Sequence, residues 1–169
     1  FSLGEALAAL PRMAPGFAPA RFEALGSPRE MAQQGFRALR EAAGARAAMV
    51  GLPEKAPFGL ALVDQAGCTL CLACTSVCPT SAFSANPDRP ELRFLEDACV
   101  QCGLCAATCP EKVITLEPRL NFAPEAAQPL VVKAEEPAAC PRCNKLFGTK
   151  SSIARVKAKL SAHWMFAEP

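Results

Sequence analysis

Two cysteine runs with the same spacing constrain this chain more than any other feature. The first run is Cys68-x2-Cys71-x2-Cys74-x3-Cys78-Pro79, and the second is Cys99-x2-Cys102-x2-Cys105-x3-Cys109-Pro110. Thiols crowded in this way occur in disulfide networks, in zinc sites and at iron–sulfur clusters.

The spacing itself favours one of these three interpretations. Disulfides need an oxidising compartment, and the sequence shows no charged segment followed by an apolar one that would direct export. Structural zinc sites use two separated ligand pairs, whereas each run here has three thiols at i, i+3 and i+6 and a fourth before a proline. We therefore expect [4Fe–4S] clusters, and a [3Fe–4S] variant is not expected because no ligand position is altered.

The repeated run closely resembles the signature of bacterial two-cluster ferredoxins. The resemblance covers about residues 58–120 and implies an α+β, ferredoxin-like domain with pseudo-twofold symmetry. In that family the fourth cysteine of each run ligates the cluster of the other run. The resemblance thus implies two ligand sets, which are Cys68, Cys71, Cys74 and Cys109 for one cluster and Cys99, Cys102, Cys105 and Cys78 for the other.

The remaining sequence divides into flanking regions around this domain. Ser27, Pro28 and Glu30 form a capping signature that predicts a helix, expected to pack against the cysteine-rich core. Apolar runs at 58–64, 92–97 and 113–120 predict strands beside the cysteines. The predicted organisation is a helical extension (1–57), the ferredoxin domain (58–120), a linker (121–139), and a CxxC knuckle with a basic amphipathic helix (140–169).

A separate pair, Cys140 and Cys143, lies in the C-terminal region and suggests a zinc half-site. We consider three hypotheses: the second pair of ligands lies beyond Pro169, the site is completed by His163 or by a neighbouring copy, or the thiols are free. A helix capped by Thr149 is expected to follow, with an apolar stripe of Ile153, Val156, Leu160 and Trp164.

Charge is unevenly distributed along the chain. The net charge is +2 overall, with −3 in residues 58–120 and positive values on both sides. The basic helix carries Lys150, Arg155, Lys157 and Lys159, but without interleaved aromatic residues a solvated face is favoured over nucleic-acid binding. We expect the basic flanks to fold back on the acidic cluster region or to dock an acidic redox partner.

These patterns predict an electron carrier or relay domain and not an enzyme. Every cluster position is cysteine, so no iron is open to a substrate, and no nucleophile–base pair or phosphate-binding glycine loop is apparent. The expected partners are a redox enzyme or further iron–sulfur domains of the same, longer chain. The alternative is an iron–sulfur or zinc-stabilised interaction module without redox turnover.

The start at Phe1 and the Ala- and Arg-rich composition suggest a C-terminal fragment of a larger, cytoplasmic, multi-cluster bacterial protein. No apolar stretch reaches the roughly 18 residues that a membrane-spanning helix needs, so no membrane span is expected. An exposed apolar patch near Leu3–Leu10 or on the C-terminal helix would favour a further alternative, an iron–sulfur subunit permanently bound in a dehydrogenase or reductase.

Two expectations concern the cluster surroundings. Because neither run completes a cluster alone, residues 58–120 are expected to be largely unfolded without iron. The apolar shell around the clusters is expected to include Leu72, Val77, Val100, Leu104 and Ile114.

Overall fold

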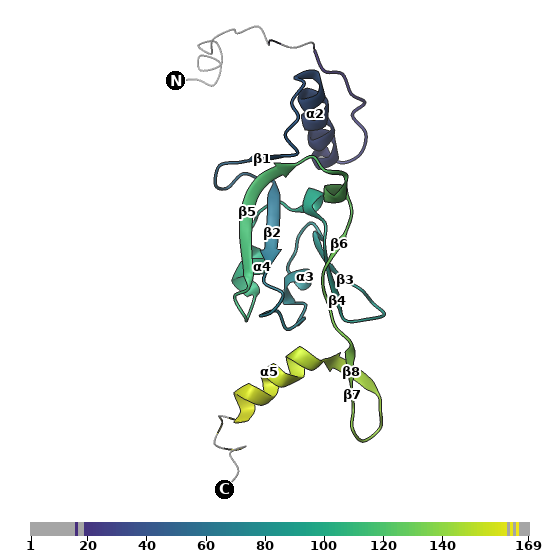
Figure 1. Cartoon of the computed structure of the whole chain (residues 1–169), viewed down its shortest axis with the longest axis vertical. Coiled ribbons are helices and arrows are strands. Elements are labelled where there is room, and N and C mark those ends of the chain that lie inside the picture. Colours follow the sequence, from purple (N-terminus) through teal and green to yellow (C-terminus); the bar gives the residue numbers. More distant parts are fainter. Residues whose placement is uncertain (1–15, 17–18, 162, 164, 166–169) are drawn as a thin grey trace. The chain divides into compact units, whose positions relative to one another are not determined.

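The structure is a computed structural model that describes residues 16, 19–161, 163 and 165 (Figure 1). The chain forms two compact units, Phe1–Ala47 and Ala48–Pro169. The apolar patch expected at Leu3–Leu10 and the predicted stripe residue Trp164 lie outside the described residues.

The N-terminal unit contains helix α2, Pro28–Ala42. Its capping box is the predicted one, because the Ser27 hydroxyl accepts from the Glu30 amide at 3.3 Å and the Glu30 carboxylate accepts from the Ser27 amide at 2.7 Å. The helix closes at Ala43, and Gly44 follows in the left-handed region with φ of 63°. The helix is therefore confirmed, whereas its packing against the cysteine-rich core stays a prediction.

Substituting Ser27 by alanine should loosen the first turn of α2. Loss of an N-cap side chain costs about 1 kcal/mol, which corresponds to roughly fivefold faster amide exchange in that turn. Exchange rates of residues 30–34 measure this, and Ser27→Thr is the control because threonine keeps the acceptor hydroxyl. Equal exchange rates in Ser27→Ala and the wild type would contradict the capping role.

The second unit holds the cysteine runs and three small sheets. Strand order is β1-β5-β2 in the first sheet and β3-β4-β6 in the second, and β7 pairs with β8 in a hairpin. The elements are β1 Met49–Gly51, β2 Gly59–Val63, α3 Ala73–Ser76, β3 Phe83–Ala85, β4 Glu91–Phe94, η1 Glu96–Ala98, α4 Leu104–Thr108, β5 Ile114–Asn121, η2 Pro124–Ala127, β6 Leu130–Ala134, β7 Pro137–Ala139, β8 Leu146–Thr149 and α5 Lys150–Ser161.

The core of this unit joins the strands to the cysteines. Strand β2 pairs antiparallel with β5, so that Val63 lies opposite Ile114, and both side chains are buried. Leu92, the most deeply buried large side chain, lies on β4 beside Phe83 and Phe94, whose ring centroids are 4.8 Å apart. The three strands predicted beside the cysteines are confirmed as β2, β4 and β5.

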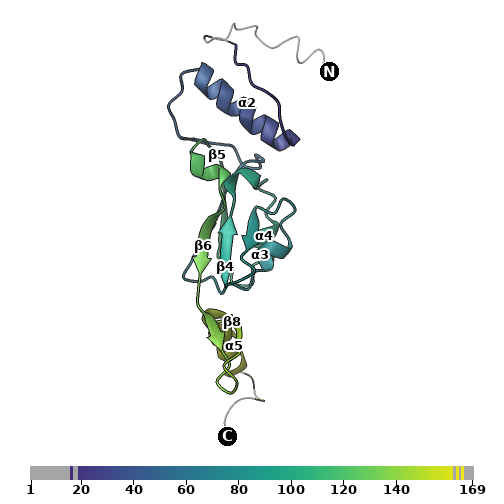
Figure 2. The same ribbon diagram turned by 90° about the vertical axis from the view of Figure 1, so that its right-hand side faces the viewer.

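The region predicted as a linker is more ordered than expected. Residues 121–139 include β6, which pairs with β4 along Leu130–Ala134 and completes the second sheet (Figure 2).

Thr149 caps α5 as predicted, since its hydroxyl accepts from the Ser152 amide at 3.1 Å. The predicted stripe on α5 is only partly covered, because Val156 and Leu160 are 52% and 41% exposed.

Candidate metal centre

The eight cysteines of the two runs line two cavities of similar size. The lining of the first cavity includes Cys68, Cys71, Cys74 and Cys109. The lining of the second includes Cys78, Cys99, Cys102 and Cys105. Each cavity therefore receives three cysteines from one run and the fourth from the other. These are the two groups that the resemblance implied, and their role as ligands stays a prediction.

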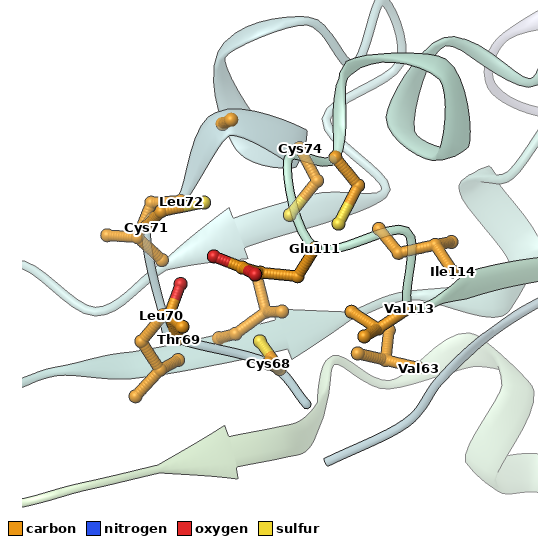
Figure 3. A pocket seen from close by; sticks show the side chains of 13 residues that line it. Val63, Cys68, Thr69, Leu70, Cys71, Leu72, Cys74, Glu111, Val113 and Ile114 are labelled. Atoms are coloured by element: carbon orange, nitrogen blue, oxygen red, sulfur yellow. The ribbon is translucent and has the colours of Figure 1, made fainter. Parts of the chain in front are cut away.

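The first cavity lies between the loop before α3 and the start of β5. Figure 3 shows Cys68 and Cys74 with their sulfur atoms facing the same space, and Val113 and Ile114 on its other side. Glu111, two residues beyond Cys109, also lines this cavity, and its side chain is only 11% exposed. The first cavity is thus lined by thiols and apolar side chains, together with the carboxylate of Glu111.

The second cavity is lined by the loop before α4 and by the turn that leads into β3. The Gln101 side-chain amide donates to the Cys99 sulfur at 3.5 Å and to the Leu60 carbonyl oxygen at 3.1 Å. The Thr80 hydroxyl lies 3.8 Å from the Cys78 sulfur. Two side-chain polar groups therefore contact sulfur atoms of this cavity.

The backbone around the two cavities repeats, as the cysteine spacing does. Helices α3 and α4 each begin after a residue in the left-handed region, Leu72 with φ of 60° and Gly103 with φ of 80°. Left-handed conformations are uncommon for residues other than glycine, and they curl the backbone around a small volume. The positive φ values recur at matching positions of the two runs: Leu70 and Gln101, Leu72 and Gly103, and Ser81 and Lys112.

Burial and hydrogen bonding act differently on the thiols. Burial, together with the smaller effect of the nearby thiols Cys68 and Cys71, raises the pKa of Cys74 to about 12. Burial also raises the pKa of Cys105. Burial alone would raise the pKa of Cys78, but hydrogen bonds from the amides of Phe83 and Thr80 outweigh it and lower the pKa.

Burial likewise raises the pKa of Cys68, although the Leu70 amide and the charge of Lys133 oppose it. A buried thiol with a raised pKa stays protonated at neutral pH, and the positive charge of a bound metal would favour its thiolate form. Cysteine ligands bind metals as thiolates, and their protons are released on binding.

The donor set of each cavity fits an iron–sulfur cluster better than a single ion. Four thiols in an apolar surround are the ligands that iron–sulfur clusters take. Within the described part of the chain, no three His, Cys, Asp or Glu side chains converge closely enough to hold one metal ion. Each cavity thus presents the four-cysteine donor set that such a cluster takes. When bound, such a cluster supplies one-electron oxidation and reduction.

Cys140 and Cys143 occupy the turn between β7 and β8. The Cys140 amide donates to the Lys145 carbonyl oxygen, the Asn144 amide donates to the Cys140 carbonyl oxygen, both at 2.9 Å, and Asn144 is left-handed with φ of 55°. Hydrogen bonds from the amides of Arg142 and Cys143 lower the pKa of Cys140. Among the described residues neither His163 nor another ligand joins this pair closely enough to hold an ion.

The structure also places residues at the cavities that the sequence analysis missed. Gln101 lies within the second cysteine run, and Thr80 follows Cys78 by two residues. Their closeness to cysteines in the sequence could therefore have predicted these contacts with sulfur. Glu111 pairs with Arg155 of α5 at 2.9 Å, and this contact between remote residues had no local signal. It agrees with the expectation that a basic flank folds back on the acidic cluster region.

The expected apolar shell is only partly right. Leu72 and Ile114 line the first cavity and Val100 lines the second. Leu104, which is 46% exposed, and Val77 are not among the residues that line either cavity.

Comparison with known proteins agrees with this chemistry. Residues 67–114 match the family model of a 4Fe-4S dicluster domain. These matched residues support an iron–sulfur ferredoxin domain. The ferredoxin domain is also similar to the ferredoxin-type protein NapH of Haemophilus influenzae, with 29% identity over 75 residues. An uncharacterized ferredoxin of Methanocaldococcus jannaschii is 35% identical over 72 residues.

These similarities concern part of each protein. The aligned regions cover 42% and 43% of this chain, but only 26% of the Haemophilus protein and 39% of the Methanocaldococcus protein. The matched domain and the ferredoxin-type relatives support an electron-transfer role for this segment. None of the helices in the described part of the chain has the length and apolarity to cross a membrane.

Proposed function

We propose that this chain relays electrons through two [4Fe–4S] clusters, one in each cavity, to or from a redox enzyme or further iron–sulfur domains of a longer protein. The observation that carries the proposal is the division of the eight cysteines into two cavities of four, each drawn from both runs. Cys68, Cys71, Cys74 and Cys109 would hold one cluster. Cys99, Cys102, Cys105 and Cys78 would hold the other.

The two cavities are close enough for the thiols of one to act on the other. The neighbouring thiol of Cys105, in the second cavity, contributes to the raised pKa of Cys74 in the first. Helices α3 and α4, which carry these two residues, also pack together. An electron that enters at either cluster would therefore have a short path to the other cluster. The electron donor and acceptor would be redox proteins or reagents of suitable potential.

A second site is proposed at Cys140 and Cys143. The turn that holds them presents two thiols, and amide hydrogen bonds stabilise the Cys140 thiolate, as a zinc knuckle requires. Two ligands are half of a tetrahedral site, so the other half would come from elsewhere, either from a second copy or from further sequence.

One experiment tests both proposals. Iron, acid-labile sulfide and zinc are measured per chain in protein kept strictly anaerobic, and an EPR spectrum is recorded after reduction with dithionite and again after reoxidation. We expect about eight irons and eight sulfides, and a reversible signal from two interacting reduced clusters. Zinc between a half and one atom per chain would support the knuckle, and zinc below a tenth would exclude it in this chain.

The alternative function predicts a different result in the same samples. An interaction module that uses its clusters only as a scaffold should resist reduction or lose iron when reduced. Iron near zero together with two or more zinc atoms would refute the electron-transfer proposal.

A further inference from the structure

The segment after the ferredoxin domain reaches back to the first cavity. We define the arm as residues 130–155, which comprise β6, β7, β8 and the first half of α5. The arm lies beyond the residues that match the dicluster family, 67–114. Its polar side chains nevertheless contact three residues that line the first cavity, namely Cys68, Thr69 and Glu111.

The central contact of the arm is Lys133 on β6. Its side chain is 13% exposed, and its ammonium group donates to the carbonyl oxygens of Gln65, at 2.7 Å, and of Cys68. These two oxygens lie at the start of the first cysteine loop, so one side chain ties that loop to the second sheet. A lysine that is nearly buried must have its donors satisfied, and the two carbonyl oxygens and Glu135 do this.

The Lys133 ammonium lies against the backbone of Cys68, a residue that lines the first cavity. The ammonium group also forms an ion pair with the Glu135 carboxylate at 3.0 Å. The same carboxylate accepts a hydrogen bond from the Ser151 amide at 3.2 Å. The ammonium group therefore has a carboxylate on the arm side and Cys68 on the other. The positive end of this ion pair therefore contacts the backbone of the first cysteine of the run.

Two further contacts hold the arm against residues that line the first cavity. The Thr149 hydroxyl donates to the Thr69 carbonyl oxygen at 3.0 Å, and Thr149 is buried with 5% exposure. Arg155 pairs with Glu111 at 2.9 Å. The second cavity differs, because the side chains that contact its sulfurs, Gln101 and Thr80, belong to the ferredoxin domain itself.

We propose that Lys133 is a positioning residue of the first cluster site, which fixes the Cys68 loop and makes the two clusters electronically unequal. The inference rests on the proposed function. A fixed positive charge beside a cluster favours its reduced, more negative state, because a low local dielectric strengthens the interaction. Lys133 therefore raises the reduction potential of the first cluster.

The test compares Lys133→Met with Lys145→Met, which removes the same charge from an exposed position of the same arm. Each variant is titrated anaerobically while the EPR signals of both clusters are followed. For Lys133→Met we expect one couple to shift to lower potential, by about tenfold in its reduction equilibrium constant, or about 59 mV for one electron. The other couple and both couples of Lys145→Met should remain at wild-type values, and Lys133→Arg should restore most of the shift.

A second readout tests the positioning without relying on redox chemistry. Amide exchange of residues 65–70 should accelerate severalfold in Lys133→Met and in Thr149→Val, which removes a contact of the arm but no charge. Thr149→Val should leave both potentials within about twofold of the wild-type equilibrium constants.

The outcomes separate this inference from the proposed function. If wild-type protein holds eight irons and cycles reversibly, but Lys133→Met moves neither couple, the inference is wrong and the proposed function stands. If wild-type protein holds no clusters, the proposed function fails, and unchanged exchange of residues 65–70 in Lys133→Met would overturn the positioning role as well.

Discussion

Replacing both Cys78 and Cys99 with serine should leave the protein with about four of its eight irons. The two residues belong to different runs but line the same cavity, so both substitutions damage the second site and spare the first. Iron and acid-labile sulfide per chain, measured on anaerobically purified protein, give the result directly.

The matched variant replaces Cys78 and Cys71, which belong to the same run but line different cavities. It should lose both clusters and hold less than about one iron. If each run instead formed its own site, the two double variants would exchange results. Cys143→Ser is the control for a cysteine substitution outside the cavities, and its iron content should match that of the wild type.

Removal of iron is expected to unfold the ferredoxin domain but not α2. The core around the cysteines is small, with few large side chains fully buried, and four buried core residues are themselves cysteines that line the cavities: Cys74, Cys99, Cys105 and Cys109. Without a cation, their desolvated thiols give no attraction across the cavities. In small metal domains the binding free energy of the metal is folding free energy, on the order of 10 kcal/mol.

Amide hydrogen exchange after anaerobic treatment with an oxidant and a chelator measures this effect. The amides of β2, β4 and β5 should lose protection by at least a hundredfold. Helix α2 lies in the other compact unit and serves as an internal control, because its capping box and backbone hydrogen bonds involve no cysteine. Retention of sheet protection within twofold would show that the domain folds without its clusters.

Local sequence patterns predicted the elements closest to the cysteines. Alternating and continuous apolar runs located β2, β4 and β5, and the Ser27–Glu30 box located α2, because each of these signals is contained within a few residues. The cysteine groups of the two cavities agree with those implied by the resemblance. That agreement rests on family knowledge of the fourth cysteine, since spacing alone does not say which cavity Cys78 or Cys109 reaches.

Long-range contacts could not be predicted in this way. Strand β6 lies in a stretch rich in proline and alanine that suggested a linker, and its partner β4 is remote in sequence. Lys133 carries no motif that would associate it with Cys68. Leu104 was expected in the apolar shell because it is apolar and close to cysteines, but residue type does not specify side-chain direction, and the residue is half exposed.

The pairing of β2 with β5 has a consequence for how such a domain is used. Gly59, at the start of the segment that holds the two cysteine runs, lies opposite Pro118 near the end of that segment, so its two ends are neighbours in one sheet, and β6 then returns to pair with β4. A domain with adjacent ends can be inserted into a loop of a host protein or placed in tandem with little disturbance of either partner.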